Sequence, residues 1–269
     1  MKTLIDKKID ISIIIPNYKS KRYLRKNLSS VYNKIKPARK VEIIIVNNDK
    51  EENLEDIQEE FADIQILDHK KNVGFGEAIN LGVKKSSGRY LFFLNPDCEI
   101  VSDNIEQIID EFETNEKVGI IGSQLIGIDN EIQEWIAGKE ITLWSLVRNN
   151  LGFSSSQKIC NSREKTEVHW VSGAAMFIKK GLFDEISGFD KGFFMYFEDV
   201  DLCKRARKIG KTVYFFPKFK VRHVGGGSCL NKKIQKRDYF NSQRHYFKKH
   251  NGKMGFCILK ILQNTFRLK

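Results

Sequence analysis

The chain has 269 residues, of which 41% are hydrophobic and 30% are charged, which is ordinary for a soluble globular protein with a large core. No apolar run approaches the roughly 18 residues of a membrane-spanning helix, which argues against an integral membrane protein. The five cysteines form no CxxC pair and no secretory leader precedes them, which argues for reduced thiols in the cytosol and against a disulfide framework or a structural zinc site.

Short apolar runs alternate with longer amphipathic segments along the chain. The runs predict buried strands at residues 10–18, 41–49, 63–69, 90–94 and 118–127. Helices are predicted between them at residues 21–35, 74–88 and 104–116. A polar segment, residues 154–167, is expected to be a mobile loop. The βαβαβ order predicts an α/β fold, with a mostly parallel sheet and helices on both faces.

The net charge of +12 is concentrated at the C-terminal end. Residues 204–269 contain 19 Lys and Arg against one acid, Asp238, so this end carries +18 and the rest of the chain −6. Near the C-terminal end of the sequence, apolar residues recur at roughly helical spacing among lysines and arginines. They are Phe256, Leu259, Ile261, Leu262 and Phe266. This pattern predicts a basic amphipathic helix that either lies on an anionic membrane or docks on the protein's own core. Nucleic acid is not an expected partner, because no nucleic-acid motif occurs.

Polar residues follow three of the predicted strands, at residues 16–18, 47–49 and 95–97. Proline cannot donate to a sheet, so Pro96 should end its strand and place Asp97 just beyond the carboxyl edge. Open α/β sheets bind ligands at this edge. The alternative is a turn carboxylate that caps its own backbone.

Two common nucleotide-binding motifs are excluded. The segment GFGEAI offers Gly74 and Gly76 of a GxGxxG motif, but Ile79 stands where the third small residue belongs. No GxxxxGK occurs anywhere in the chain. Neither a dinucleotide-binding Rossmann domain nor a P-loop is therefore expected.

A resemblance to a known family comes from six segments taken together. They are, in chain order, SIIIPNYKS, VNND, NVGFGEAINLGVKKSSGRYLFFLNPD, VSGAAMFIKK, GFDKGFFMYFEDVDLCKRARKIG and RHVGGGS. This combination resembles the family 2 glycosyltransferases of the GT-A fold, and most of all their bacterial rhamnosyltransferase branch. The resemblance covers residues 11–228 and leaves out the basic tail.

The resemblance implies a GT-A domain at residues 1–228, followed by a basic amphipathic extension at residues 229–269. It further implies an inverting, metal-dependent enzyme that takes a sugar from a nucleoside diphosphate sugar, with dTDP-rhamnose as the donor that this branch suggests. The acceptor would be a lipid-linked glycan used for a bacterial surface polysaccharide. Such an enzyme would work in the cytoplasm at the inner face of the plasma membrane, in peripheral contact with anionic lipid.

The resemblance also implies a metal site for Mn²⁺ or Mg²⁺. The family's DxD-type motif reads Asn95-Pro96-Asp97 here, so Asp97 would bind the metal and Asn95 would bind the nucleotide by a hydrogen bond. Because one carboxylate of the motif is absent, the imidazole of His223 becomes important as a second ligand. The glycines at residues 225–227 would let their loop move over the pyrophosphate.

The acids Glu198, Asp199 and Asp201 form a second polar cluster. Acids at the start of a helix and bases at its end also fit simple stabilisation of the helix dipole. The resemblance implies that Asp199 is the catalytic base, which takes the proton of the acceptor hydroxyl. The acceptor is expected to contact four residues around it, namely Gly173, Tyr196, Glu198 and Asp201.

The donor pocket is assigned to the strand ends and to the glycine-rich helix start. The resemblance implies that the nucleotide base of the donor lies beside Pro16, Asn17 and Tyr18. It also implies that the ribose and the sugar lie beside Asn72, Gly74, Gly76 and Asn80. Most relatives have Val-Asp-Asn where this chain has Val46-Asn47-Asn48, so Asn47 is uncharged and Asp49 or Glu52 would compensate.

Two alternatives to a glycosyltransferase were weighed. A sugar-1-phosphate nucleotidyltransferase would need a glycine-rich, arginine-containing loop after the first strand, and the segment PNYKSKR is not one. An inactive partner tethered to the membrane by its tail is the other alternative. The presence of Asp97, Asp199 and His223 argues against it.

Overall fold

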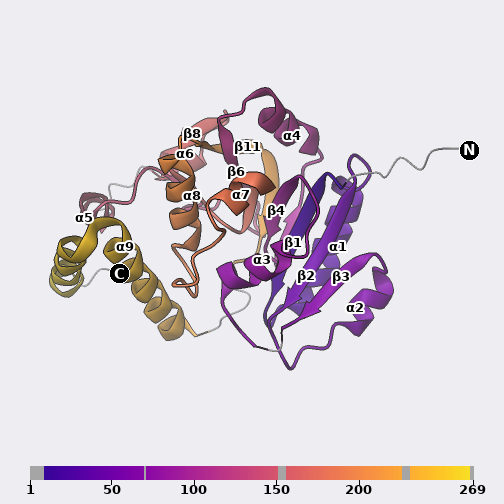
Figure 1. The fold of residues 1–269 in the computed structure, drawn as a ribbon, viewed down its shortest axis with the longest axis horizontal. Coiled ribbons are helices and arrows are strands. Elements are labelled where there is room, and N and C mark those ends of the chain that lie inside the picture. Colours follow the sequence, from indigo (N-terminus) through magenta and orange to yellow (C-terminus); the bar gives the residue numbers. More distant parts are fainter. Residues whose placement is uncertain (1–8, 70, 151–155, 226–230, 267–269) are drawn as a thin grey trace, which may run out of the picture.

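The computed structural model describes residues 9–69, 71–150, 156–225 and 231–266. They form a nine-stranded sheet in the order β3-β2-β1-β4-β10-β6-β11-β5, with β8 paired to β11, and helices pack on both faces (Figure 1). The short strands β7 and β9 form a separate two-stranded sheet.

The strands lie close to the predicted apolar runs, with further strands in the second half of the chain. They are β1 (Ile11–Asn17), β2 (Val41–Asn47), β3 (Ile64–Asp68), β4 (Tyr90–Leu94), β5 (Cys98–Ile100), β6 (Val118–Ile126), β7 (Ala137–Gly138), β8 (Thr166–Val168), β9 (Trp170–Val171), β10 (Ala175–Lys179) and β11 (Thr212–His223). The helices are α1 (Lys21–Lys34), α2 (Glu55–Glu60), α3 (Phe75–Val83), α4 (Ile105–Thr114), α5 (Leu143–Asn150), α6 (Ser156–Cys160), α7 (Lys180–Glu185), α8 (Glu198–Lys208) and α9 (Lys232–Phe266).

The order of the first four strands fixes where a ligand can bind. Strands β3, β2, β1 and β4 are all parallel, as predicted, whereas β10 runs antiparallel to both β4 and β6. The chain moves outward from β1 to β2 and β3, then returns to the other side of β1 to form β4. Because such crossovers are right-handed, α1 and α3 cover opposite faces, and a crevice forms between β1 and β4.

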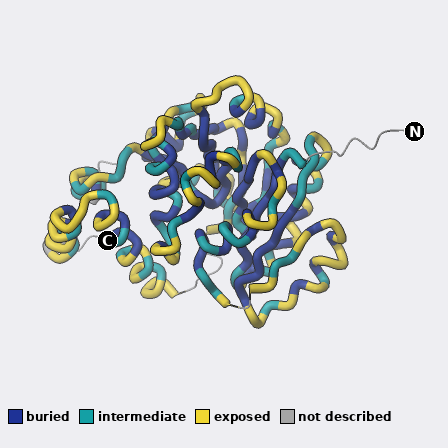
Figure 2. Tube along the Cα trace, viewed as in Figure 1, coloured by how far each residue is buried: buried dark blue, intermediate teal, exposed yellow. Residues whose placement is uncertain are grey.

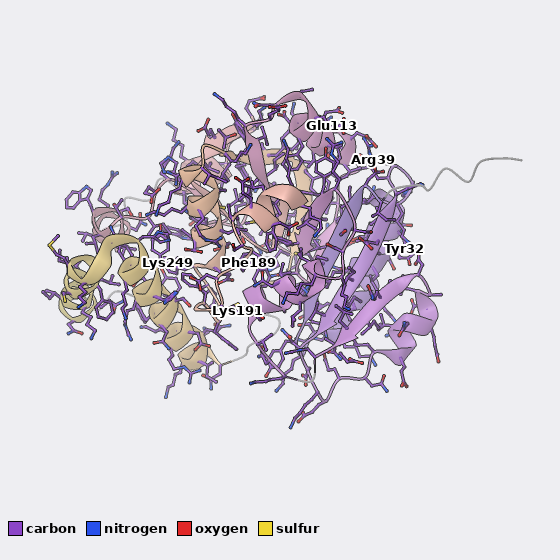
Figure 3. The ribbon with its side chains drawn as sticks, viewed as in Figure 1. Tyr32, Arg39, Glu113, Phe189, Lys191 and Lys249 are labelled. Atoms are coloured by element: carbon purple, nitrogen blue, oxygen red, sulfur yellow. The ribbon has the colours of Figure 1, made fainter. Side chains whose placement is uncertain are left out.

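The core lies around the central strands (Figure 2). Every residue of β1 and β4 is buried, as expected for strands covered on both faces. The rings of Phe92 and Phe177 stack across β4 and β10 with centroids 3.8 Å apart. Phe189 lies near the middle of the molecule, 5.4 Å from the ring of Phe93 (Figure 3). The first half of the sheet is therefore a rigid platform for its polar carboxyl edge.

The polar segment 154–167 was predicted to be a mobile loop, and this prediction was wrong for its described part. The segment contains α6 and the start of β8, which pairs with β11. Ser156 donates a hydrogen bond of 2.6 Å from its hydroxyl to the main-chain oxygen of Ala137, and Cys160 is buried beside it. The polar composition of the segment predicted a loop, because it gave no sign of these tertiary contacts.

The basic tail is helical, as predicted, but it is not one straight helix. Gly252 has non-helical angles (φ 68°, ψ −166°) and divides α9 into a first part before it and a second part after it. Tyr246 and Phe247 of the first part are fully buried in the main core. Gln263 of the second part accepts a hydrogen bond from Arg244 and donates one to Gln243, so the second part folds back on the first (Figure 1). Among the described residues, no helix is long and apolar enough to cross a membrane.

Candidate active site

A cavity of about 840 Å³ lies at the carboxyl edge of the sheet. It reaches from the ends of β1, β2 and β4 to the start of α8, and residues of α5 and α9 close its other side. This volume is typical of sites for small-molecule ligands. Most of the predicted site residues line it: Pro16, Tyr18, Asn72, Gly74, Asn95, Asp97, Gly173, Tyr196, Glu198, Asp199 and His223.

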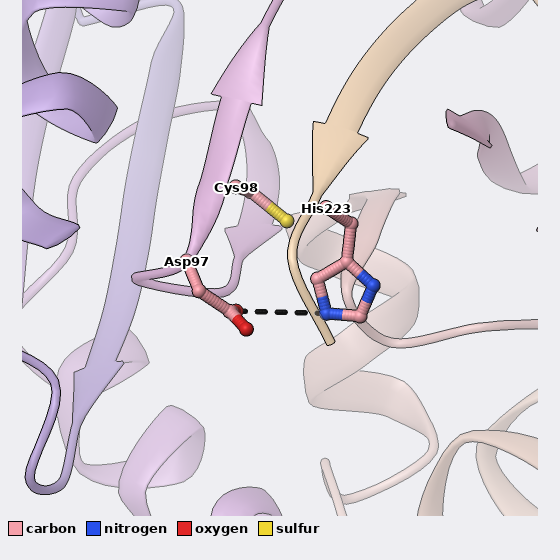
Figure 4. Close-up of side chains that lie close together, drawn as sticks. All are labelled: Asp97, Cys98 and His223. Atoms are coloured by element: carbon pink, nitrogen blue, oxygen red, sulfur yellow. Dashed lines mark ion pairs between the residues drawn. The ribbon is translucent and has the colours of Figure 1, made fainter. Parts of the chain in front are cut away.

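Asp97 and His223 face one another in the cavity (Figure 4). His223 is the last residue of β11, whose antiparallel pairing with β5 places it opposite Cys98. Nε2 of His223 lies 3.5 Å from Oδ1 of Asp97. The other carboxylate oxygen of Asp97 accepts a hydrogen bond of 3.1 Å from the main-chain N–H of Gly225.

Gln133 fixes the orientation of the His223 ring. Its Nε2 donates to the main-chain oxygen of His223 at 2.6 Å, so its Oε1 is the atom that lies 2.9 Å from Nδ1 of the ring. Because an amide oxygen only accepts, Nδ1 carries the proton and Nε2 of the neutral ring presents a lone pair to Asp97. Burial lowers the pKa of His223 and so favours the neutral ring, although the charge of Asp97 acts in the opposite direction.

This pair of side chains fits a divalent cation. A lone pair and a carboxylate that face one another can both coordinate a cation, and both are ligands that Mn²⁺ or Mg²⁺ accepts. Cys98 lies beside Asp97 and His223. Burial, together with the charge of Asp97, raises the pKa of its thiol well above the usual range. The protonated thiol is a poor ligand. Gly226 and Gly227, the other glycines of the predicted mobile loop, lie outside the described residues.

Glu198 and Asp199 are the first two residues of α8. One carboxylate oxygen of Asp199 accepts a hydrogen bond of 2.9 Å from the N–H of Gly173, and the other accepts one of 2.8 Å from Val200. Burial raises the pKa of Asp199. Burial, together with the charge of Asp199, raises the pKa of Glu198 well above its usual range. Oε2 of Glu198 has no hydrogen-bond partner among the described residues. The cavity therefore holds the oriented carboxylate of Asp199 beside the carboxyl group of Glu198, whose raised pKa favours the neutral form.

Asp201 does not line the cavity, contrary to its predicted position beside the acceptor. It is fully buried and bonds to Arg205 at 2.7 Å, and to Lys249 and His250 at 2.8 Å each. Burial alone would raise its pKa, but the hydrogen bond of His250 and the charges of Arg205 and Lys249 lower it. Asp201 therefore links α8 to α9 and supports the fold.

At the end of β2, Asn48 rather than Asn47 lies in the cavity. Asn47 is buried outside the lining and donates to Asp68 Oδ1 and to the main-chain oxygen of Glu52, both at 2.9 Å. Asn48 is the first residue after β2, and its buried Oδ1 has no partner in the described part of the chain. This oxygen is available to accept a hydrogen bond from a nucleotide base.

The other residues expected near Asn47 have structural contacts instead. Glu52 accepts hydrogen bonds from Asn17 and from the N–H groups of Ser20 and Lys21 at the start of α1. Asn17 and Asp49 are both buried but do not line the cavity.

Gly74 allows two segments of the cavity wall to approach closely. It has a φ of 86°, and a Cβ atom here would lie 2.2 Å from the main-chain oxygen of Phe194. Gly76 and Asn80 lie outside the lining. The amide of Asn80 both donates to and accepts from the main chain of Phe189, at 2.9 Å each. These two residues therefore support the wall and do not form it.

Several cavity residues were not predicted from the sequence. Two tryptophans and a cation line the side near α5, and two residues of α9 complete that side: Trp135, Trp144, Arg148, Gln235 and Tyr239. Trp135 and Trp144 are 49% and 68% exposed, which is unusual for large apolar residues. No local motif indicated these residues, because they come together only in the fold.

The family is identified by a model of Glycosyl transferase family 2, which matches residues 12–187. The chain belongs to this family. The match includes Asp97 and Gly173 but ends before α8 and α9. The strand-end side of the cavity is therefore covered by the family match, and the α8 side lies outside it.

Two curated relatives are similar over much of the chain. The low-salt glycan biosynthesis hexosyltransferase Agl10 of Haloferax volcanii is 26% identical over 210 residues, which cover 77% of this chain and 63% of that protein. The N-acetylglucosaminyl-diphospho-decaprenol L-rhamnosyltransferase of Mycobacterium tuberculosis is 22% identical over 182 residues, covering 61% of this chain and 59% of that protein. The matches therefore span less than two thirds of the length of these relatives.

A solved structure supports the fold. The structure of GalNAc-T7 with UDP, GalNAc and Mn²⁺ superposes with a TM-score of 0.65, covering 98% of this chain and 55% of that chain at 16% identity. At this identity the likeness concerns the fold alone. It confirms the predicted α/β GT-A fold.

Proposed function

We propose that the protein is a metal-dependent, inverting glycosyltransferase that moves a sugar from a nucleoside diphosphate sugar to a hydroxyl of a lipid-linked glycan. The observation that carries this proposal is that the Asp97–His223 pair and the carboxylate of Asp199 line one cavity at the carboxyl edge of the sheet. A pyrophosphate leaving group needs a cation, and an attacking hydroxyl needs a base. The cavity offers groups suited to both.

The donor would bind along the strand ends. Pro16 and Tyr18 would border the nucleotide base of the donor. The free amide oxygen of Asn48 would accept a hydrogen bond from this nucleotide base. Asn95 donates to the nucleotide. Asp97 and His223 would hold the divalent ion, which when bound would supply positive charge for the pyrophosphate leaving group. The rhamnosyltransferase name of the mycobacterial relative supports rhamnose as the transferred sugar.

Asp199 would act as the general base. Its two hydrogen bonds, from Gly173 and Val200, hold the carboxylate in one orientation while it takes the proton of the acceptor hydroxyl. The acceptor oxygen then bonds to the anomeric carbon from the face opposite the pyrophosphate. The nucleoside diphosphate leaves with the bonding electron pair, so the configuration inverts. The carboxyl of Glu198, whose raised pKa favours the protonated form, would donate a hydrogen bond from Oε2 to a sugar oxygen.

The acceptor would occupy the side formed by α5 and α9. Trp135 and Trp144 can stack on a sugar or cover an apolar chain, and Arg148 can pair with a phosphate. The decaprenol-linked substrate in the name of the mycobacterial relative supports a lipid-linked acceptor for this chain. Such an acceptor would be reached at a membrane surface, and we propose the cytoplasmic face of the plasma membrane.

The second part of α9 is suited to membrane contact. Met254 is 77% exposed and Ile261 is 63% exposed, and the exposed cations Lys253 and Lys260 lie near them in the sequence. Apolar side chains among lysines favour an anionic surface. The variant Met254→Ser/Ile261→Ser should bind phosphatidylglycerol vesicles more weakly than the wild type does. Equal sedimentation of both proteins with these vesicles would contradict a membrane role for this surface.

The proposed reaction can be tested with a panel of nucleoside diphosphate sugars. We expect one of them, dTDP-rhamnose first, to raise the thermal unfolding midpoint only when Mn²⁺ or Mg²⁺ is present. The same donor should be consumed when a lipid-linked glycan is added. Asp97→Ala is the matched control, since it should lose the metal-dependent stabilisation. A panel in which every donor binds equally with and without metal would overturn the metal-dependent mechanism.

A further inference from the structure

The segment that leads into the catalytic helix has an unfavourable backbone. Tyr196 and Phe197 have φ angles of 70° and 65°, in the left-handed region that bulky aromatic residues rarely adopt. They directly precede Glu198 and Asp199. Such a conformation persists only where surrounding contacts hold it in place. The position of Asp199 therefore depends on whatever packs against residues 190–197.

The first part of α9 contacts this segment at its beginning. Asp190 accepts a bond of 2.6 Å from Nζ of Lys249, and Nε2 of His245 lies 3.4 Å from the same carboxylate. The ring of His245 also packs edge-on against Phe193, with centroids 4.6 Å apart.

The middle of the segment is held by a hydrogen bond and by aromatic contacts. The buried hydroxyl of Ser242 donates to the main-chain oxygen of Met195 at 2.7 Å. The ring of Tyr239 lies 5.9 Å from that of Tyr196 and 5.4 Å from that of Phe197. These contacts act directly on the two residues with positive φ.

Lys249 joins the two ends of the segment. Its ammonium lies 2.6 Å from the carboxylate of Asp190 and 2.8 Å from that of Asp201, one turn into α8. Figure 3 shows Lys249 on α9. The buried His250 bonds to the same oxygen of Asp201. One side chain of α9 thus bridges the start of the strained segment and the helix that follows it.

We propose that the first part of α9 belongs to the catalytic unit, where Ser242 and Lys249 act as positioning residues for Asp199. Without these contacts, residues 190–197 would relax toward ordinary backbone angles and move the Asp199 carboxylate away from the acceptor hydroxyl. Donor binding should change much less than turnover, because neither Ser242 nor Lys249 holds the strand ends or the Asp97–His223 pair, and the segment meets the donor wall where Phe194 packs against Gly74. This inference rests on the proposed role of Asp199 as the base.

Single substitutions in the full-length protein test this role. Ser242→Ala and Lys249→Met should each lower kcat by about tenfold or more, because misplacement of a reacting group by about 1 Å can cost up to 10²-fold. The dissociation constant of the donor should change less than twofold. Ser242→Thr keeps the hydroxyl and should restore most of the turnover. Lys248→Met is the matched control on the exposed neighbouring position and should behave as the wild type.

Hydrogen exchange separates positioning from a general loss of stability. The amides of residues 190–198 should exchange faster in Ser242→Ala and Lys249→Met, whereas those of β1 and β4 should not change. Wild-type kcat and wild-type exchange in both variants would overturn the inference. A failure of the base assignment is recognised separately, because Asp199→Asn would then keep normal turnover whatever the α9 variants do.

Discussion

The two sides of the cavity are built in different ways. On the nucleotide side, Pro16, Asn48 and Asn95 lie at the ends of parallel strands, and main-chain pairing fixes their places. On the α8 side, Asp199 follows a segment with two positive φ angles that side chains of α9 hold. The first side depends on a sheet that any apolar sequence of the right pattern maintains. The second depends on a few individual side chains.

This difference predicts how each side responds to substitution. Loss of a side chain at a strand end should remove one ligand contact and leave the geometry unchanged, since the strands are buried and paired on both edges. Loss of a contact on the α8 side should shift neighbouring groups as well. Binding of the donor and turnover should therefore separate in mutant data.

The largest effect is expected on the sheet side. Asp97→Ala removes the only carboxylate of the Asn95-Pro96-Asp97 motif and should abolish both activity and metal-dependent nucleotide binding, with the thermal unfolding midpoint nearly unchanged. Activity and Mn²⁺-dependent binding of the nucleotide are measured in parallel. Asp103→Ala, at an exposed nearby position, is the control. If the wild type binds its donor equally with and without Mn²⁺, the role given to Asp97 is wrong.

The next effect belongs to the α8 side. Asp199→Asn retains the shape of the side chain but removes the carboxylate that we propose as the base, so turnover should fall by about 10² to 10⁴-fold with donor affinity nearly unchanged. The measurement is kcat at saturating acceptor, beside a donor titration. A wild-type kcat would sink the assignment and leave Glu198 as the alternative base in the cavity.

The sequence predicted the sheet side better than the α8 side. Strand ends follow from local patterns, so the position of Asp97 at the polar edge of the sheet was predicted correctly. Even there, Asn47 was assigned to the donor pocket from its place in the family's motif, whereas the structure places Asn48 in the cavity and Asn47 outside its lining.

Residues that act through tertiary contacts were missed or misplaced. Gln133 lies 90 positions from His223 in the sequence, and no motif joins them. Asp201 was expected beside the acceptor because it stands two residues after Asp199, but which face of α8 is covered by α9 is not a local property. The basic tail likewise gave no indication in the sequence that Tyr239 would line the cavity.

Substitution of Gln133 should have an intermediate effect, because Gln133 supports His223 on the sheet side of the cavity. Gln133→Leu removes the acceptor that fixes the proton on Nδ1 of His223, and loss of such a supporting partner typically weakens metal binding about 10 to 100-fold. The affinity for Mn²⁺ in the presence of nucleoside diphosphate, measured by electron paramagnetic resonance, should fall in this range. The tautomer of His223 can be followed by nitrogen NMR. Unchanged Mn²⁺ affinity with a mixed tautomer would contradict the positioning role.

The smallest effect on turnover is expected at Asp201, because Lys249 keeps its bond to Asp190 when Asp201 is replaced, and the larger cost should fall on stability. Asp201→Asn leaves Arg205 without its acidic partner and Lys249 with Asp190 alone, and loss of one partner of a buried charge pair typically destabilises a protein by about 3 kcal/mol. Chemical denaturation measures this loss. Asp184→Asn breaks an exposed pair with Lys180 and should cost about 0.5 kcal/mol or less.

The pH dependence of folding stability shows whether Asp201 stabilises the fold in its ionised form. Because its partners lower the pKa of Asp201 below the ordinary 3.8, its ionised form stabilises the fold fully above about pH 4, and this contribution is lost as the pH falls further. The stability difference between the wild type and Asp201→Asn should therefore be constant near neutral pH and shrink below pH 4. A difference that grows on acidification would show that Asp201 does not hold α8 and α9 together as a charged group.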